Sequence, residues 1–177
     1  MKTIILLLLT TALSTQVQAQ LHFSGNVQSS HLWRGIEVAN GLVFTTDISL
    51  SDAKNHFHIG LWGGANAQGT YKEFNNYVSY TYRGFSLALW DTYNFSPNAT
   101  YNNKEFFNYK ACETGRFLDA IACYRFEGRF PLLISWSTVI FGRDRNADNS
   151  ANKYSTFCYA EYPVYQKGEW RADVGIG

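Results

Sequence analysis

The sequence has little of what marks several common protein classes. Cysteine and proline occur three times each in 177 residues, and the formal net charge is +1. Three cysteines do not make a disulfide framework, and the balanced charge gives no sign of a nucleic-acid surface. After the N-terminus, no run of about 18 apolar residues could span a bilayer as a helix. No catalytic triad, carboxylate pair or glycine-rich phosphate loop is readable, so we expect no enzyme and no cofactor.

The N-terminus has the pattern of a secretory signal. Lys2 precedes a short apolar stretch at residues 4–13, and Val17-Gln18-Ala19 resembles a small-residue cleavage site. Such a segment is removed on export and takes no part in the fold. No cysteine follows the cleavage site, which argues against a lipoprotein. We expect residues 1–19 to be a signal peptide and residues 20–177 to be one exported domain.

The rest of the chain alternates in hydrophobicity with a period of two. In residues 42–51, Leu42, Phe44, Ile48 and Leu50 fall on one face, and the residues between them, such as Asp47, are mostly polar. Side chains of a strand point alternately to opposite faces of a sheet. The pattern therefore predicts strands with one apolar and one polar face, as a transmembrane barrel requires. Aromatic residues, at 17% of the chain, are also abundant enough for interfacial girdles.

The alternation predicts about nine strands, and connection lengths indicate how they are joined. The expected strands are residues 21–30, 42–51, 56–66, 73–82, 85–93, 117–126, 132–141, 154–164 and 169–176. Their connections alternate in length, and the longer ones are residues 31–41, 67–72, 94–116 and 142–153. Outer-membrane barrels show this alternation, with short periplasmic turns and long outer loops. We therefore predict an all-β, antiparallel, up-and-down transmembrane β-barrel in the outer membrane of a bacterium.

Several short motifs resemble one family of barrels. Ser30-His31-Leu32-Trp33-Arg34-Gly35-Ile36 is similar to the aromatic-Arg-Gly motif that follows the first strand of TorF-type porins. His58-Ile59-Gly60-Leu61-Trp62-Gly63 resembles their next strand, and residues 131–142 and Tyr154-Ser155-Thr156-Phe157 also look similar. The resemblance covers residues 21–177. It implies an outer-membrane barrel of the Bacteroidetes type, and it supplies no catalytic residues.

Charged residues on the expected inner faces are the candidate pore lining. They are Asp47, Glu73, Asp119, Arg125, Glu161, Arg171 and Asp173. They could set ion preference in an open pore, or they could form salt bridges that fill a narrow barrel. Trp33, Arg34 and Gly35 are expected in a mouth loop. There Arg34 could clamp an anion, or it could pack into the constriction while Gly35 permits the bend.

Two further residue groups have a plain and a functional interpretation. His56 and His58 are expected on one inner face, where they could bind a metal ion, but no third ligand is placed and we predict no metal site. Cys112, Cys123 and Cys158 are expected to be free. Cys112 lies in a loop, and Cys123 and Cys158 are expected on opposite faces of neighbouring strands, which prevents a disulfide.

Three functions follow from this reading. The first is a porin for passive diffusion of small solutes, with outer-membrane lipid as its surroundings and no nucleic-acid partner. The second is a filled barrel that acts as an anchor or binds ligands through its surface loops. The third is a soluble secreted β-sandwich that binds carbohydrate. The solute and the oligomeric state are not readable from the sequence.

The strand number carries an expectation of its own. Bacterial single-chain barrels have even strand numbers, so nine strands predict a chain that is incomplete at its C-terminus, with about 10–12 strands in the full protein. We therefore expect these residues to form a curved, open sheet. The alternative is a closed barrel formed by residues 21–177 alone.

Overall fold

The computed structural model describes residues 19–177, which form an all-β fold. The predicted signal peptide, apart from Ala19, lies outside the described residues. The strands are β1 (Gln20–Trp33), β2 (Ile36–Ser51), β3 (Phe57–Asn66), β4 (Lys72–Tyr82), β5 (Phe85–Asn94), β6 (Arg116–Arg125), β7 (Leu133–Gly142), β8 (Thr156–Lys167) and β9 (Trp170–Ile176). Residues 19–177 contain no helix that is long and apolar enough to cross a membrane.

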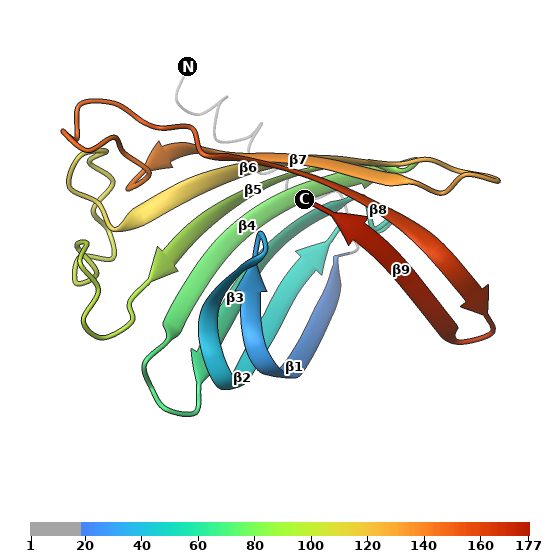
Figure 1. Ribbon diagram of the computed structural model, residues 1–177, viewed down its shortest axis with the longest axis horizontal. Coiled ribbons are helices and arrows are strands. Elements are labelled where there is room, and N and C mark those ends of the chain that lie inside the picture. Colours follow the sequence, from blue (N-terminus) through green and yellow to red (C-terminus); the bar gives the residue numbers. More distant parts are fainter. Residues whose placement is uncertain (1–18) are drawn as a thin grey trace, which may run out of the picture.

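The nine strands form one sheet in which every strand pairs with its neighbour in sequence. The order is β1 to β9 without a crossover, and each pair is antiparallel. The sheet is strongly curved, with a hollow side and a convex side (Figure 1). β1 and β9 are its two edges in the described residues, so the sheet is open. The predictions of nine antiparallel up-and-down strands and of a curved, open sheet are confirmed.

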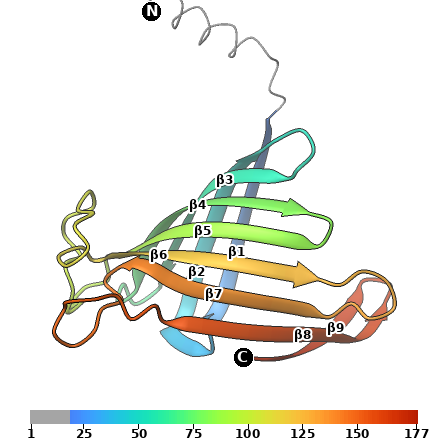
Figure 2. The same cartoon turned by 90° about the horizontal axis from the view of Figure 1, so that it is seen from above.

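The two ends of the sheet differ in their connections. Residues 95–115 and 143–155 form long loops at one end, which we call the loop end (Figure 2). The opposite end carries shorter connections such as the turn at Arg83-Gly84, and we call it the turn end. That turn was predicted from the sequence, and both of its residues have positive φ, at 47° and 78°. This pair of angles is the one that tight hairpin turns need.

The first connection differs from the prediction. Residues 31–41 are not a loop, because β1 continues to Trp33 and β2 already begins at Ile36. Arg34 and Gly35 form the whole connection, with φ of 52° and 75°. The predicted alternation of long and short connections fails at residues 67–71, a connection no longer than residues 52–56 at the turn end, and it is wrong for the first hairpin. The reason is local, because an Arg-Gly pair flanked by apolar residues forms the same tight turn here as at Arg83-Gly84.

The β1–β2 hairpin is bent in the half that ends at its turn. The pairing register shifts between Gln28 and Ser30 and again between His31 and Leu32, and Gly41 opposite has a φ of 72°. Bulges of this kind bend a strand pair and increase its twist. Figure 1 shows the result, since the hairpin curls at one end and its tip rises into the hollow side of the sheet.

Strand β8 also departs from the predicted limits. It runs to Lys167 rather than to Val164, and it begins at Thr156 rather than at Tyr154. Its pairing with β9 shifts register between Pro163 and Tyr165. Proline has no N–H to donate to a ladder, so a strand that contains it needs such an irregularity. The last turn consequently shrinks to Gly168 and Glu169.

Candidate functional site

The hollow side of the sheet has an aromatic centre. The Tyr77 ring on β4 stacks on the Trp90 ring of β5, with a centroid distance of 4.4 Å and an interplanar angle of 16°. Gly60 lies opposite Tyr77 in the ladder, and a Cβ there would come within 2.4 Å of the Tyr77 ring. Only glycine leaves room for this ring to lie flat on β3. The hollow side is thus lined by rings as well as by polar groups.

The tip of the β1–β2 hairpin is fastened across this hollow. Nη2 of Arg34 donates to Oδ2 of Asp119 on β6 at 2.6 Å, and Nη1 donates to the Ser155 carbonyl at 3.4 Å. The Trp33 ring packs on Phe117, with centroids 5.6 Å apart. The side chains of Arg34 and Asp119 are only 10% and 5% exposed. A charge-assisted pair of this kind holds the tip strongly.

These contacts revise the expected role of the mouth residues. Trp33, Arg34 and Gly35 belong to the hairpin and its turn, so the expected mouth loop is wrong as a structural element. Arg34 faces Asp119, which leaves its guanidinium occupied rather than open to an external anion. The sequence reasoning missed this partnership because the two residues lie 85 positions apart. No local pattern signals a contact of that range.

Two cavities flank the fastened tip. One has a volume of about 330 Å³ and is lined by rings such as Trp62, Trp90 and Phe117 together with polar groups. The other has a volume of about 450 Å³ and lies between the tip and the start of β8. Trp33, Phe117 and Arg143 line both cavities. The tip therefore narrows the hollow at the loop end without filling it.

Two of the predicted charged residues hold the aromatic and amide groups beside the cavities. Asp47 accepts a hydrogen bond of 2.9 Å from the Tyr77 hydroxyl. Glu73 accepts bonds from the side-chain amides of Asn75 at 2.9 Å and Asn94 at 3.2 Å. Nearby in the β3–β4 connection, burial first and then the charge of Glu73 raise the pKa of the Tyr71 hydroxyl.

Four other predicted residues form a separate network toward the turn end. Arg125 donates to Glu161 at 3.1 Å, and Arg171 lies 3.5 Å from the same carboxylate. Arg171 also pairs with Asp173 at 2.7 Å. Four of the seven predicted residues thus come together in one network on β6, β8 and β9. Asp119 lies apart from them with Arg34, so the seven do not form a single charged ring.

A second buried arginine was missed by the sequence reasoning. Arg116, at the start of β6, has a side chain with no exposed surface and pairs with Asp91 at 3.0 Å. The Phe106 and Tyr109 rings of the long loop lie 4.3 and 4.8 Å from its guanidinium. Burial and the hydrogen bond to Asp91 raise the pKa of the Tyr109 hydroxyl. The signal was Asp91 itself, a carboxylate at an outward-facing position that required a partner.

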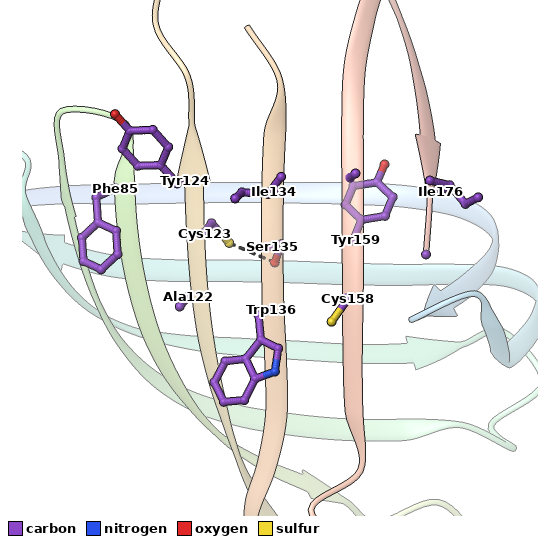
Figure 3. Close-up of a pocket in the computed structure, with 12 residues that line it drawn as sticks. Phe85, Ala122, Cys123, Tyr124, Ile134, Ser135, Trp136, Cys158, Tyr159 and Ile176 are labelled. Carbon is purple, nitrogen blue, oxygen red and sulfur yellow. Dashed lines mark hydrogen bonds between the residues drawn. The ribbon is translucent and has the colours of Figure 1, made fainter.

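The convex side carries an apolar hollow of about 730 Å³ over β5 to β9 (Figure 3). Small residues such as Ala122, Cys158 and Ala160 form its floor, between larger side chains such as Trp136 and Tyr124. Trp136 pairs with both Ala122 and Cys158 in the ladders. The hollow follows from this alternation of large and small residues, and it lies apart from the polar site.

The histidine and cysteine predictions have mixed outcomes. His56 and His58 do not share a face. His56 precedes β3 and packs at 5.2 Å from Tyr82, whereas His58 lies 5.4 Å from His22. Strict alternation fails for His56 because it lies in the turn. Within residues 19–177, no group of three or more metal-ligating side chains is found.

All three cysteines are free, as predicted. The expected reason was partly wrong, because β7 lies between the strands of Cys123 and Cys158. Those two strands are therefore not neighbours. Cys123 instead donates to the Ser135 hydroxyl at 3.1 Å across the β6–β7 pair, as the dashed line in Figure 3 marks.

Comparison of the chain with protein-family models, with curated proteins and with solved structures finds no match in any of the three. The resemblance to TorF-type porins therefore stays a hypothesis based on short motifs. The two faces of the sheet and the site at the loop end are the features that bear on function.

Proposed function

We propose that this protein is a bacterial outer-membrane β-barrel that lets small solutes diffuse through a lumen narrowed by the β1–β2 hairpin tip. One observation carries the proposal. The convex face of the sheet exposes a continuous apolar surface, and the hollow face holds the paired charges and polar groups. This is the reverse of a soluble protein, in which the enclosed side is apolar.

The exposed apolar surface has the layout of a membrane-facing band. Aliphatic residues expose 37–53% of their surface along the middle of the strands, including Ile48, Ile59, Leu61, Leu87 and Leu89. An uncovered apolar patch of this extent is rare on a soluble monomer. Lipid is the occupant that fits it, because the patch follows successive strands around the outside of the curve. The hollow beside Trp136 has an apolar lining suited to a lipid chain.

Aromatic residues border this surface at both ends. At the turn end the exposed rings are Phe57, Tyr80, Tyr82, Phe85, Tyr124, Phe126, Phe130, Tyr165 and Trp170. At the loop end, Phe95, Phe107 and Tyr109 are exposed. Aromatic girdles at the two membrane interfaces are a regular feature of transmembrane barrels. Their positions here support a bilayer-spanning sheet between them.

The unpaired edges of the sheet, β1 and β9, have to be satisfied if the sheet spans a membrane. In lipid, an unpaired backbone group costs several kcal/mol. β1 and β9 therefore each need a hydrogen-bonding partner in the membrane, whether from each other, from further strands or from another chain. A spanning sheet has to satisfy this condition, and the reconstituted protein should show the resistance to unfolding that closed barrels have.

A filled barrel is the second candidate, and one observation favours it. The lumen-facing charges of Asp119, Arg125, Glu161 and Arg171 are all engaged in ion pairs. Such pairs could fasten a plugged lumen. The soluble sandwich has less support, because the described residues form one sheet and supply no second layer.

Channel recording separates the candidates. The full-length protein is reconstituted into a planar lipid bilayer, and single-channel steps are measured in salt. Steps of constant size support the porin proposal. Stable insertion into the bilayer without conductance rejects it and favours the filled barrel. Recovery of a monodisperse protein in water without detergent rejects both membrane proposals.

A further inference from the structure

Arg143 is the one arginine of the hollow side that lacks an acidic partner in the described residues. It follows the last residue of β7, and its guanidinium lies 3.8 Å from the Tyr101 ring and 5.1 Å from the Phe117 ring. Its Nη1 atom is buried and makes no hydrogen bond within residues 19–177. A buried donor without a partner costs free energy, more so on a charged group.

The other arginines of the hollow side have acidic partners. The buried Nη2 of Arg116 also makes no hydrogen bond, but the Arg116 guanidinium is paired with Asp91. Arg34 is paired with Asp119, while Arg125 and Arg171 share Glu161. The chain thus neutralises guanidinium groups wherever they enter the hollow, with Arg143 as the exception. The carboxylates around Arg143 are already engaged. Asp144 accepts from the Ser155 backbone N–H and hydroxyl at 2.8 and 2.7 Å.

The surroundings of Arg143 suit a ligand with a flat body. Arg143 lines both cavities beside the hairpin tip, of about 330 and 450 Å³. Trp33 and Phe117 line both as well, and Phe157 lines the larger one. Rings on the walls favour a planar or apolar ligand body. A guanidinium favours a carboxylate, which it can bind through two parallel hydrogen bonds.

We propose that Arg143 anchors a binding subsite for small monocarboxylates with a planar body. The carboxylate accepts hydrogen bonds from the Arg143 guanidinium, which lines both cavities, and the ring of the ligand packs against the aromatic walls. The subsite rests on the proposed function in one respect, since the lumen supplies its ligand. It names the solute class that the constriction would favour over neutral or dianionic molecules of similar size.

Direct binding to the detergent-solubilised full-length protein tests the subsite. Benzoate serves as the probe and benzamide, its neutral analogue, as the matched ligand control, both measured by isothermal titration calorimetry. We expect saturable benzoate binding and at least about tenfold weaker benzamide binding, because benzamide offers the guanidinium no charged, bidentate acceptor. Equal binding of the two ligands, or none, would overturn the proposal.

Two variants locate the binding. Arg143→Gln should weaken benzoate binding about tenfold or more. Arg129→Gln, in the exposed β6–β7 turn at the far end, removes the same charge and should change nothing. Equal losses in both variants would show a general charge effect and reject the subsite. Inorganic phosphate is the third probe, and binding as tight as that of benzoate would reject the role of the planar body.

A measurement on the unaltered protein keeps the test valid if Arg143→Gln does not fold. Phenylglyoxal modifies arginines, and benzoate should slow its reaction at Arg143 but not at Arg129, as read by peptide mass spectrometry. Unchanged labelling of Arg143 rejects the subsite. The two proposals can be rejected independently. A conducting channel that does not bind benzoate rejects only the subsite. Benzoate binding without conductance rejects only the pore.

Discussion

At the residue scale, the two faces of each strand decide what a substitution does. Ile134 exposes 44% of its surface on the convex side, and it pairs with Tyr124 and Ala160 in the ladders. Ser135, one position on, accepts the hydrogen bond of Cys123 on the hollow side. Adjacent residues therefore face an apolar surface and a polar one.

Arginine at these two positions should have unequal effects. Ile134→Arg should destabilise the membrane-inserted protein by roughly 2 kcal/mol, because a charge in lipid costs about 2–4 kcal/mol at mid-bilayer and less near the interface. Ser135→Arg should cost far less. Urea unfolding in lipid vesicles measures both, and equal losses would contradict the assignment of the two faces.

A turn carboxylate predicts a pH dependence. Asp52 accepts the backbone N–H groups of Phe57 and His56 at 2.9 and 2.6 Å, and the bond from Phe57 is the main cause that lowers its pKa. A lowered pKa in the folded state means that the stabilisation is complete above the ordinary pKa of aspartate and is lost as the pH falls through the folded value.

Asp52→Ala should therefore be less stable than the unaltered protein at pH 7, and the difference should shrink toward pH 3. Unfolding in urea at a series of pH values measures it. Glu127→Ala, which removes a carboxylate from the exposed β6–β7 turn, controls for general effects of charge. A difference that grows on acidification would mean that Asp52 is not the stabilising acceptor.

At the element scale, the β1–β2 hairpin bends away from the sheet toward its hollow side. Its bulges aim the tip into the hollow, and the pair between Arg34 and Asp119 fastens it there. The same Arg-Gly turn at Arg83-Gly84 joins strands that stay in the sheet. Both hairpins have the same Arg-Gly turn. The bulges in β1–β2 therefore explain why only its tip leaves the sheet.

Under the proposed function, releasing the tip should widen the lumen. Asp119→Asn and Arg34→Gln should each raise single-channel conductance, and the double variant should add little, because both break one contact. In the free energy of unfolding, the coupling energy between the two changes should be about 2–3 kcal/mol, as for an ion pair with little exposure. Asp47→Asn, which alters a hollow-side carboxylate that does not touch the tip, is the control. Additive effects of the two single changes would show that they act independently.

At the scale of the whole molecule, charge in the hollow is divided between two ends. The tip pair lies at the loop end, and the network of Arg125, Glu161, Arg171 and Asp173 lies toward the turn end. Within this network Glu161 faces two arginines. Its removal leaves Asp173 as the only carboxylate against them.

Glu161→Gln should therefore shift ion selectivity toward anions. The reversal potential of the reconstituted channel in a salt gradient measures the shift. Asp148→Asn removes the same charge from an exposed loop position and should leave the potential nearly unchanged. A shift toward cations would mean that charges outside this network govern the constriction.

The local sequence determined the strands, because alternation of apolar and polar side chains is a property of neighbouring residues and maps directly onto the two faces of a strand. It also determined the turn at Arg83-Gly84. The same reasoning could have found the turn at Arg34-Gly35, since the dipeptide is identical. Most charged residues of the hollow side could be named from alternation, but Arg143 and the partners of the others could not.

Only the tertiary structure decided which distant residues meet. Arg34 reaches Asp119 because bulges bend the first hairpin and the sheet curves around it, and both effects accumulate over many residues. For the same reason the isolation of Arg143 cannot be read from its neighbours in sequence. Whether a charged side chain has a partner depends on the curvature of the whole sheet. The face of the sheet to which a side chain points depends only on the residue's place in its strand.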